Sequence, residues 1–240
     1  MYLRIEQIEK SFGKQRVLHP TSFAVPQGQV LSVLGRSGSG KTTLLKIIAG
    51  LEESDAGEVF LDDSPITTWS PQKRGIVYLY QEPLLFPHLS VRENIGFGLS
   101  LRGVKAQDIA SRVDEMIRHL ELDGQAGKMP DQLSGGQRQR VAFGRALIIN
   151  PKVLLLDEPF AALDSQTRSQ MQQLFKKMAD RHQITALFVT HDLKEALIMG
   201  DQLAVIRKGE WRLYEDREAF MRDPQTGVQD ELAFWDQWRH

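Results

Sequence analysis

The fold is decided by the stretch Gly35-Arg36-Ser37-Gly38-Ser39-Gly40-Lys41-Thr42. It matches the phosphate-binding pattern G-x-x-x-x-G-K-[ST] at every fixed position. An apolar, β-branched run precedes it at 30–34, and apolar residues recur at helical spacing over 44–48. The context is therefore a strand, a tight loop and a helix, which is the setting that the pattern needs.

This loop is expected to hold the phosphates of a nucleotide. Glycines let the backbone bend closely around an anion, and the loop N–H groups and the positive helix N-terminus attract phosphate oxygens. Lys41 would reach the β- and γ-phosphates, and Thr42 would place its hydroxyl on Mg²⁺. The alternative, a glycine-rich turn that merely joins a strand to a helix, is disfavoured by this context. The nucleotide-binding residues predicted in this stretch are Gly35, Ser37, Gly38, Ser39, Gly40, Lys41, Thr42 and Thr43.

Composition restricts the classes of function. The 240 residues suit one large domain, and 30 basic against 31 acidic residues give a formal net charge of -1, which offers no electrostatic argument for a nucleic-acid partner. The absence of cysteine excludes disulfides and thiolate metal sites and favours an intracellular protein. Charges alternate through the opening residues, unlike a signal peptide, and no apolar run approaches the roughly 20 residues of a membrane helix. Any membrane role is expected to come through a partner.

The hydrophobic pattern predicts strands and helices in a defined order. Short strands joined by turns are expected before residue 25. Residues 84–150 change character, with 3.6-residue spacing from Ile109 to Leu120, and predict a helical insertion between strands of one sheet. Two continuous apolar runs, 153–156 and 186–190, are typical of buried parallel strands. Further elements are expected as a strand at 75–80, a helix at about 165–181 and a closing hairpin at 203–214.

Polar residues follow the two apolar runs, at the sheet edge where ligands gather in open α/β sheets. Asp157 is expected to hold Mg²⁺ through its water shell, since this cation prefers oxygen ligands. Glu158, pointing the other way along an extended chain, would orient or deprotonate the attacking water. His191 would donate a hydrogen bond to the γ-phosphate, and the Gln81 amide oxygen would complete the metal shell. Taken singly, the acidic pair is more typical of a solvated turn and His191 of an ordinary loop histidine.

A second glycine-containing helix start lies at 133–140, Leu-Ser-Gly-Gly-Gln-Arg-Gln-Arg. Ser134 followed by two glycines gives free N–H groups at a positive helix end, and hence another anion site. One nucleotide does not easily fill two such sites, and alone the stretch would be interpreted as an N-capped helix with a basic face. Phe12 lies at a turn, where it would stack on a base or cover the sheet edge. From its own segment core packing is the preferred interpretation.

Together these motifs make the chain resemble the ATP-binding subunit of ABC transporters over essentially its whole length. The resemblance is carried, in order, by GRSGSGKTT at 35–43, Gln81, LSGGQ at 133–137, VLLLDEP at 153–159, Ala162-Leu163-Asp164 and Thr190-His191-Asp192. It implies an α/β fold: a P-loop NTPase core with a mostly parallel sheet, an N-terminal antiparallel β subdomain and a helical subdomain. It also implies a single ABC ATPase domain over 1–240, with 84–150 inserted in a RecA-like core.

The resemblance implies ATP hydrolysis in a head-to-tail dimer, formed by two copies of the chain or with a related ATPase subunit. ATP and Mg²⁺ on the 35–43 loop of one subunit would be closed over by Ser134 and Gly136 of the other, which explains the second anion site. Asp164 would bridge the dimer, and Gln81 would join the metal to a transmembrane subunit. The residues so assigned are, for catalysis, Lys41, Gln81, Glu158 and His191; for Mg²⁺, Thr42, Gln81 and Asp157; and for the nucleotide, beside the loop, Phe12, Ser134, Gly135, Gly136, Gln137 and Asp164.

Phe12 stands where the family usually has an adenine-stacking tyrosine. Stacking needs only a ring, so the resemblance reverses the preference from core packing to stacking. The stretch 81–95 resembles bacterial importers of the sulfate, iron and polyamine kind, which implies a peripheral subunit on the cytoplasmic face of the inner membrane that drives permease subunits and binds no nucleic acid. Several of those importers carry a C-terminal regulatory domain, for which 240 residues leave no room, so the cargo class stays open.

Two other classes of protein compete with this interpretation. A soluble ABC-type ATPase acting on ribosomes or DNA would more typically show two cassettes, a long coiled-coil insertion or a basic face, and the sequence has none of these. A non-hydrolysing nucleotide-binding scaffold is disfavoured because every catalytic candidate is present. The aromatic tail with Phe234, Trp235 and Trp238 is too short for a second core, and we expect it to pack against the body, with a partner contact as the alternative.

Overall fold

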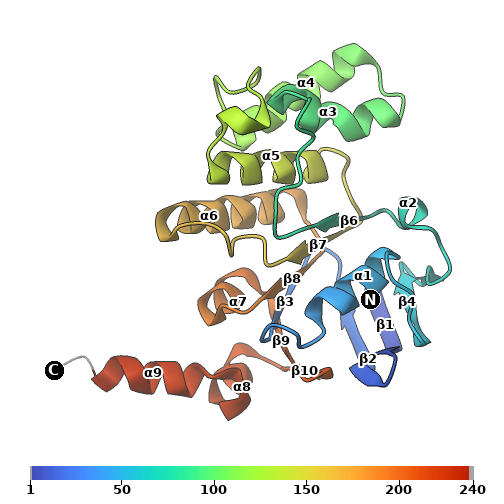
Figure 1. Cartoon of the computed structure of the whole chain (residues 1–240), viewed down its shortest axis with the longest axis vertical. Coiled ribbons are helices and arrows are strands. Elements are labelled where there is room, and N and C mark those ends of the chain that lie inside the picture. Colours follow the sequence, from blue (N-terminus) through green and yellow to red (C-terminus); the bar gives the residue numbers. More distant parts are fainter. Residues whose placement is uncertain (1, 238–240) are drawn as a thin grey trace.

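The computed structural model describes residues 2–237, and its elements alternate along the chain as the sequence predicts (Figure 1). The strands are β1 (Leu3–Phe12), β2 (Gln15–Val25), β3 (Val30–Leu34), β4 (Ala56–Leu61), β5 (Ser64–Pro65), β6 (Ile76–Leu79), β7 (Val153–Asp157), β8 (Ala186–Thr190), β9 (Gln202–Arg207) and β10 (Glu210–Leu213). The helices are α1 (Lys41–Ala49), α2 (Pro71–Arg74), α3 (Val91–Leu101), α4 (Ala106–His119), α5 (Gly135–Leu147), α6 (Ser165–His182), α7 (Leu193–Met199), α8 (Arg217–Arg222) and α9 (Val228–Gln237), with single 3-10 turns η1 (Pro130–Gln132) and η2 (Pro224–Thr226).

A six-stranded sheet in the order β10-β9-β3-β8-β7-β6 forms the centre of the molecule. Its strands are parallel except for β10, which pairs antiparallel with β9. The apolar runs are buried on both faces because alternate residues serve two cores. Leu154 and Leu156 pack with α5 and α6, whereas Val153 and Leu155 pack with α1. The predicted buried parallel strands are confirmed.

A four-stranded antiparallel sheet in the order β2-β1-β4-β5 contributes to the core under α1. The prediction of short strands in this region was wrong in length, since β1 has 10 residues and β2 has 11. Their pairing shifts register after Ile5 and again after Ile8, and Gln7 between them has a φ of 50°. With these irregularities β1 stays paired with β2 along its length, although its alternation of apolar and polar residues is interrupted.

The helices α3, α4 and α5 follow β6 and precede β7, and they form the upper part of the molecule in Figure 1. Val113, Met116 and Ile117 on α4 face the same core as α5 and the outer side of β7, as their spacing predicted. Ser90 and Ser134 begin α3 and α5 with capping boxes, which satisfy N–H groups that the first helical turn leaves free. The helical segment is therefore where the sequence placed it, and the boundaries 84–150 remain a prediction.

The chain ends in the hairpin of β9 and β10 followed by α8, η2 and α9, which lie at the bottom of Figure 1. Phe220 and Val228 enter a small third core with Tyr214. The expected packing of the aromatic tail holds only for its beginning, because the side chain of Phe234 is 52% exposed. The side chain of Trp235 and the whole of Trp238 lie outside what the structure describes.

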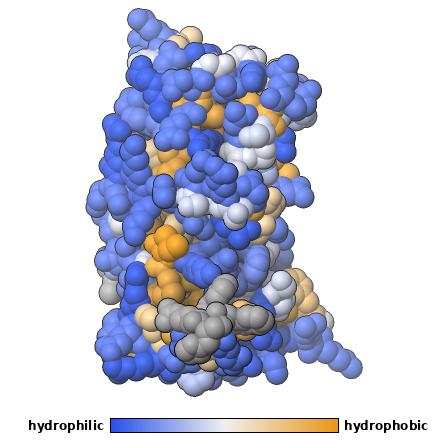
Figure 2. Space-filling model, turned by 90° about the vertical axis from the view of Figure 1, so that its left-hand side faces the viewer, coloured by the Kyte–Doolittle hydropathy of each residue, from blue (hydrophilic) through white to orange (hydrophobic). Residues whose placement is uncertain are grey.

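Among residues 2–237, no helix is both apolar enough and long enough to cross a lipid bilayer. Figure 2 shows one face of the molecule, where hydrophobic residues lie in separate clusters among hydrophilic ones. Large exposed apolar side chains include Tyr80 and Leu84, on either side of Gln81 in the sequence. This is the region in which the sequence predicted a contact with a membrane subunit.

The sheet brings three chain turns together at its carboxyl edge. The N–H of Gly35 donates to the carbonyl of Thr190 at 3.1 Å, and the N–H of Glu158 donates to the carbonyl of Val189 at 3.0 Å. Hydrogen bonding thus continues one residue past β3 and β7, against β8. The phosphate-loop motif, the acidic pair and the histidine are held side by side as a consequence of strand order.

Candidate active site

The loop between β3 and α1 depends on glycine at Gly40, whose φ is 105° at the N-cap of the helix. A Cβ atom at this position would lie 2.8 Å from the carbonyl oxygen of Val17 and 2.8 Å from Cδ2 of Leu18. Any other residue would combine a strained backbone with a steric clash. Gly38 also has a positive φ, 76°, and has open space around it. The loop is therefore shaped by its glycines, as the pattern requires.

Lys41 is buried, with 4% of its side chain exposed, and its ammonium group lies inside the loop. Nζ donates to the carbonyl oxygens of Gly35 at 2.7 Å and Arg36 at 3.0 Å, and it lies 3.2 Å from Oε1 of Glu158. A buried ammonium group requires such partners, because taking an unpaired charge out of water is costly. The lysine is thus held at the point where the motif places phosphate.

Asp157 ends β7, and its Oδ2 accepts two hydrogen bonds. Thr42 Oγ1 donates to it at 2.9 Å and the hydroxyl of Tyr78 at 2.6 Å. Burial raises the pKa of Tyr78, and its hydrogen bond to the Asp157 carboxylate raises it further. The predicted metal pair Thr42 and Asp157 is brought together, and the tyrosine is a member of the site that sequence reasoning missed. The structural reason is the strand register: Tyr78 pairs with Leu155, so Asp157, two residues on, faces the same side of the sheet.

Glu158 lies between the loop and the histidine. Its Oε2 is 2.6 Å from Nδ1 of His191, and its Oε1 contacts Lys41. The expectation that Glu158 continues an extended chain and points away from Asp157 is wrong, because its φ is 47° and the strand has ended. The left-handed backbone turns both carboxylates toward one pocket. Such a backbone in a non-glycine residue is uncommon and is found frequently at functional sites.

One pocket collects predicted residues from five parts of the chain. Gly35 and Ser39 do not line this pocket: Ser39 is buried, and Gly35 lines the neighbouring pocket. Phe12 lines the pocket and is half exposed, and its stacking on a base remains a prediction. The lining is formed by Phe12, Val17, Ser37, Gly38, Gly40, Lys41, Thr42, Thr43, Gln81, Asp157, Glu158 and His191.

The second predicted anion site does not line this pocket. Ser134 caps α5, accepting from the N–H of Gln137 at 3.2 Å, while the Gln137 side chain accepts from the N–H of Ser134. A Cβ on Gly136 would overlap the methyl group of Thr167, whose N–H donates to the Asp164 carboxylate at 3.0 Å. This hydrogen bond lowers the pKa of Asp164. Gly136 and Asp164 are thus neighbours through Thr167, with Gly135 beside them, and α5 and α6 begin at one place.

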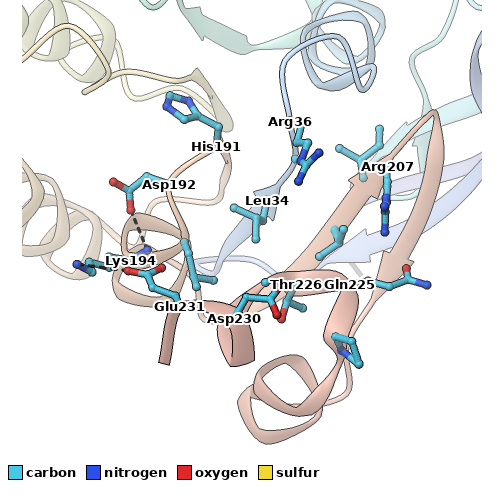
Figure 3. A pocket seen from close by; sticks show the side chains of 16 residues that line it. Leu34, Arg36, His191, Asp192, Lys194, Arg207, Gln225, Thr226, Asp230 and Glu231 are labelled. Atoms are coloured by element: carbon cyan, nitrogen blue, oxygen red, sulfur yellow. Dashed lines mark hydrogen bonds and ion pairs between the residues drawn. The ribbon is translucent and has the colours of Figure 1, made fainter. Parts of the chain in front are cut away.

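A further pocket lies next to the first and shares His191 with it (Figure 3). Arg36 and Arg207 line one side of it, and Asp230 and Glu231 of α9 line the other. Lys194 on α7 pairs with Glu231 at 3.4 Å. The C-terminal segment therefore borders the back of the phosphate loop.

The donor set fits a magnesium ion carried by a nucleotide better than a metal held by protein alone. Within residues 2–237, no group of three His, Cys, Asp or Glu side chains could hold a metal ion. A hydroxyl, a carboxylate and an amide at Thr42, Asp157 and Gln81 offer the oxygen ligands that Mg²⁺ uses beside phosphate and water. The site therefore needs the phosphates to complete it.

A phosphate loop that joins a strand to a helix, with an acidic pair and a histidine at the same sheet edge, defines a P-loop nucleotide-binding protein. Comparison with known sequences agrees, since the sequence model of the ABC transporter family matches residues 18–161. The chain belongs to this family.

Individual relatives narrow the comparison. The sulfate/thiosulfate import ATP-binding protein CysA of Xylella fastidiosa is 47% identical over 213 residues, which are 87% of this chain and 61% of that protein. The Fe(3+) ions import ATP-binding protein FbpC of Escherichia coli O157:H7 is 41% identical over 208 residues, 87% of this chain and 60% of that protein. The chain thus spans about 61% of the length of the first of these curated relatives.

A solved structure shares the fold over nearly the whole chain. It is described as the dimeric, post-hydrolysis state of an ATP-binding cassette bound to ADP and Pi, and it superposes with a TM-score of 0.77 at 30% sequence identity. The match covers 89% of this chain and 99% of the other. The expected α/β fold, a mostly parallel central sheet with an antiparallel β subdomain, is confirmed.

Proposed function

We propose that the chain is the ATP-binding subunit of an ABC importer, which hydrolyses ATP in a head-to-tail dimer and drives transport through a separate membrane subunit. One observation carries the proposal: Lys41, Thr42, Asp157, Glu158 and His191 meet in a single pocket at the carboxyl edge of the sheet. Support comes from relatives that are import ATP-binding proteins and from a structural neighbour that holds ADP and Pi.

Each of these side chains has a separate task in hydrolysis. Lys41 would exchange its contacts with Glu158 and the loop carbonyls for the β- and γ-phosphates, because an ammonium group binds phosphate as a point charge. Glu158, released from the lysine, would accept a proton from the attacking water. His191 would hold Glu158 by the 2.6 Å contact and donate to the γ-phosphate. Catalysis then comes from positioning and from charge stabilisation around the phosphate.

Thr42 and Asp157 would hold Mg²⁺ beside the phosphates, and the amide oxygen of Gln81 would complete its shell. When bound, the ion would neutralise charge that develops on the phosphate oxygens. The hydroxyl of Tyr78 fixes the carboxylate of Asp157, so that one oxygen stays directed at Thr42. Asp157 is therefore oriented before any nucleotide enters.

The dimer would supply the second half of the site. The start of α5, with Ser134, Gly135, Gly136 and Gln137, carries N–H groups of a helix N-terminus but does not line the pocket of its own chain. In a head-to-tail pair it would face the γ-phosphate on the other subunit, with Asp164 at the contact between them. The dimeric state of the structural neighbour supports this arrangement.

The membrane partner would bind near residues 81–95. Gln81 lines the nucleotide pocket, while Tyr80 and Leu84 beside it are 40% and 55% exposed. A permease segment resting on these apolar side chains would sense the pocket through Gln81. The subunit would lie at the cytoplasmic face of the inner membrane as a peripheral protein. Its cargo stays open, because relatives of similar identity bear the names of different solutes.

The test replaces Glu158→Gln and measures phosphate release together with nucleotide binding. We expect a loss of phosphate release of about 100-fold or more with ATP affinity retained, because the amide cannot accept the proton. The matched control is Glu210→Gln on the exposed strand β10, which is expected to behave like the parent. Phosphate release at the parental rate by the Glu158 variant would contradict the assignment.

A further inference from the structure

Glu158 and His191 contact each other directly, and a second series of contacts connects them through the start of α6. This series has two arms, which meet at Arg168. On one arm, the N–H of Ala161 donates to the carbonyl of Glu158 at 3.2 Å. The N–H of Leu163 then donates to the carbonyl of Phe160 at 3.1 Å. This arm leads from Glu158 to the start of α6.

Arg168, one turn into α6, connects that arm to the next. Its Nη2 donates to the carbonyl of Leu163 at 3.0 Å, so the guanidinium group is bonded to the segment 161–164. Its Nη1 lies 3.6 Å from Oδ2 of Asp192, which directly follows His191. One side chain therefore contacts both the segment before α6 and the turn that carries the histidine.

The second arm runs from Arg168 to the backbone on both sides of His191, and Glu195 belongs to it. Its Oε2 accepts from Thr190 Oγ1 at 2.7 Å, and the same hydroxyl oxygen accepts from the N–H of Asp192 at 3.0 Å. His191 lies between Thr190 and Asp192 in the chain, so its backbone is fixed on both sides. Glu195 is only 3% exposed, although the hydrolysis described above gives it no task.

Arg168 and Glu195 lie close together but form no hydrogen bond with each other. Nε of Arg168 is buried and has no hydrogen-bond partner within residues 2–237, and it lies 3.9 Å from Oε1 of Glu195. A hydrogen bond needs about 2.9 Å. A movement of the Arg168 side chain by about 1 Å toward Glu195 would form this hydrogen bond. The backbone around His191 would then be held more firmly, because Glu195 accepts from Thr190.

We propose that Arg168 is a positioning residue that couples the segment 161–164 to His191 within each subunit. The inference rests on the proposed function, in which this segment lies at the contact with the second subunit. Formation of that contact would then set the histidine that holds Glu158. Hydrolysis at the nucleotide site of one subunit would then depend on the contact that its own segment 161–164 makes with the second subunit. The two nucleotide sites of the dimer would therefore act cooperatively.

The first experiment compares Arg168→Gln with the parent in steady-state ATP hydrolysis. We expect kcat to fall about tenfold or more with nucleotide affinity unchanged, because the loss is one of alignment. We also expect the dependence of the rate on ATP to lose its cooperativity. Arg181→Gln, at the exposed end of the same helix, is the matched control and is expected to behave like the parent. Arg168→Lys keeps the charge without the planar guanidinium group and is expected to show the same fall in kcat as Arg168→Gln.

A double-mutant cycle separates positioning from general damage. In a His191→Ala background, Arg168→Gln is expected to have no further effect on kcat, since both changes remove the same alignment. Equal losses in the two backgrounds would overturn the proposal, as would an unchanged kcat in the single variant.

Imidazole ¹H–¹⁵N resonances of His191, recorded without turnover, keep the two proposals apart. Arg168→Gln is expected to shift these resonances and Arg181→Gln to leave them in place. If the parent hydrolyses no ATP but Arg168→Gln still shifts the His191 resonances, the proposed function is wrong and the coupling is supported. Resonances that do not move in Arg168→Gln defeat the coupling, whatever the rate of hydrolysis.

Discussion

Nδ1 of His191 lies 2.6 Å from Oε2 of Glu158, although 33 residues separate them in the chain. The other carboxylate oxygen contacts the buried ammonium group of Lys41 at 3.2 Å. The glutamate is therefore held between a fixed cation and an imidazole, and its carboxylate has one defined orientation. The proton transfer proposed for Glu158 therefore depends on its contact with the histidine.

Replacing His191→Ala is expected to lower phosphate release by about 100-fold and to change ATP affinity by less than about twofold. The reason is that Glu158 loses its orientation while Lys41 and the loop still bind the phosphates. Single-turnover phosphate release and equilibrium nucleotide binding measure the two effects. His182→Ala, at the far end of α6, serves as the control. A His191 variant that lost binding and turnover together would show that the histidine shapes the pocket instead.

Tyr78→Phe is expected to weaken the response to Mg²⁺ and to destabilise the fold by about 1.5–3 kcal/mol, the range for a hydrogen bond to a charged group. Without the hydroxyl, Oδ2 of Asp157 keeps only Thr42 as a donor and is free to rotate. Mg²⁺ titration of the ATPase rate should show a several-fold higher midpoint. Tyr80→Phe, beside it but without this bond, is the matched control. An unchanged midpoint in Tyr78→Phe would mean that the tyrosine serves stability alone.

The fold was predictable because its signals are local. The loop 35–42 indicates a strand and a helix on either side of it, and the runs 153–156 and 186–190 are typical of buried strands. Two of the catalytic candidates, Glu158 and His191, come directly after these two strands. What escaped prediction depends on register and on turns: the bond between Tyr78 and Asp157 requires knowing that β6 pairs with β7, and the left-handed Glu158 requires knowing where the strand stops.

The contacts of Arg168 were beyond sequence reasoning for another reason. An arginine one turn into an amphipathic helix is most simply interpreted as a solvated side chain. Its role becomes visible only when Leu163 and Asp192, 29 residues apart, are brought to opposite ends of one guanidinium group. The position of Ser134 relative to the nucleotide is likewise a property of a dimer, which one chain does not contain.

Gly40→Ala is expected to reduce both stability and nucleotide binding. A left-handed alanine costs about 1–2 kcal/mol, and the clash with Val17 and Leu18 adds to this. Gly103→Ala is the control, because Gly103 also has a positive φ, 69°, but has open space around it and lies far from the pocket in the chain. Chemical denaturation and ATP binding should show a stability loss in both variants and a binding loss in Gly40→Ala alone. Normal binding in that variant would show that the loop tolerates the shift.

Glu195→Gln is expected to change how stability depends on pH. Burial raises the pKa of the Glu195 carboxyl above its ordinary value of 4.5; the Thr190 hydrogen bond opposes that rise, and the nearby Asp192 charge adds to it. Since the folded state binds this proton more tightly than the unfolded state, the stabilising contribution is complete below pH 4.5 and is lost as the pH rises through the folded pKa.

The uncharged glutamine keeps an oxygen that accepts from Thr190 and has no proton to lose. The free energy of unfolding of Glu195→Gln, relative to the parent, should therefore increase as the pH rises from 4.5 through the folded pKa and become constant above it. Denaturant titrations of both proteins at a series of pH values give this difference directly. Asp180→Asn, exposed on α6, should show no such trend. A difference that stays flat across the series would mean that the carboxyl is ionised in the fold without penalty, held by Arg168 and Gln172.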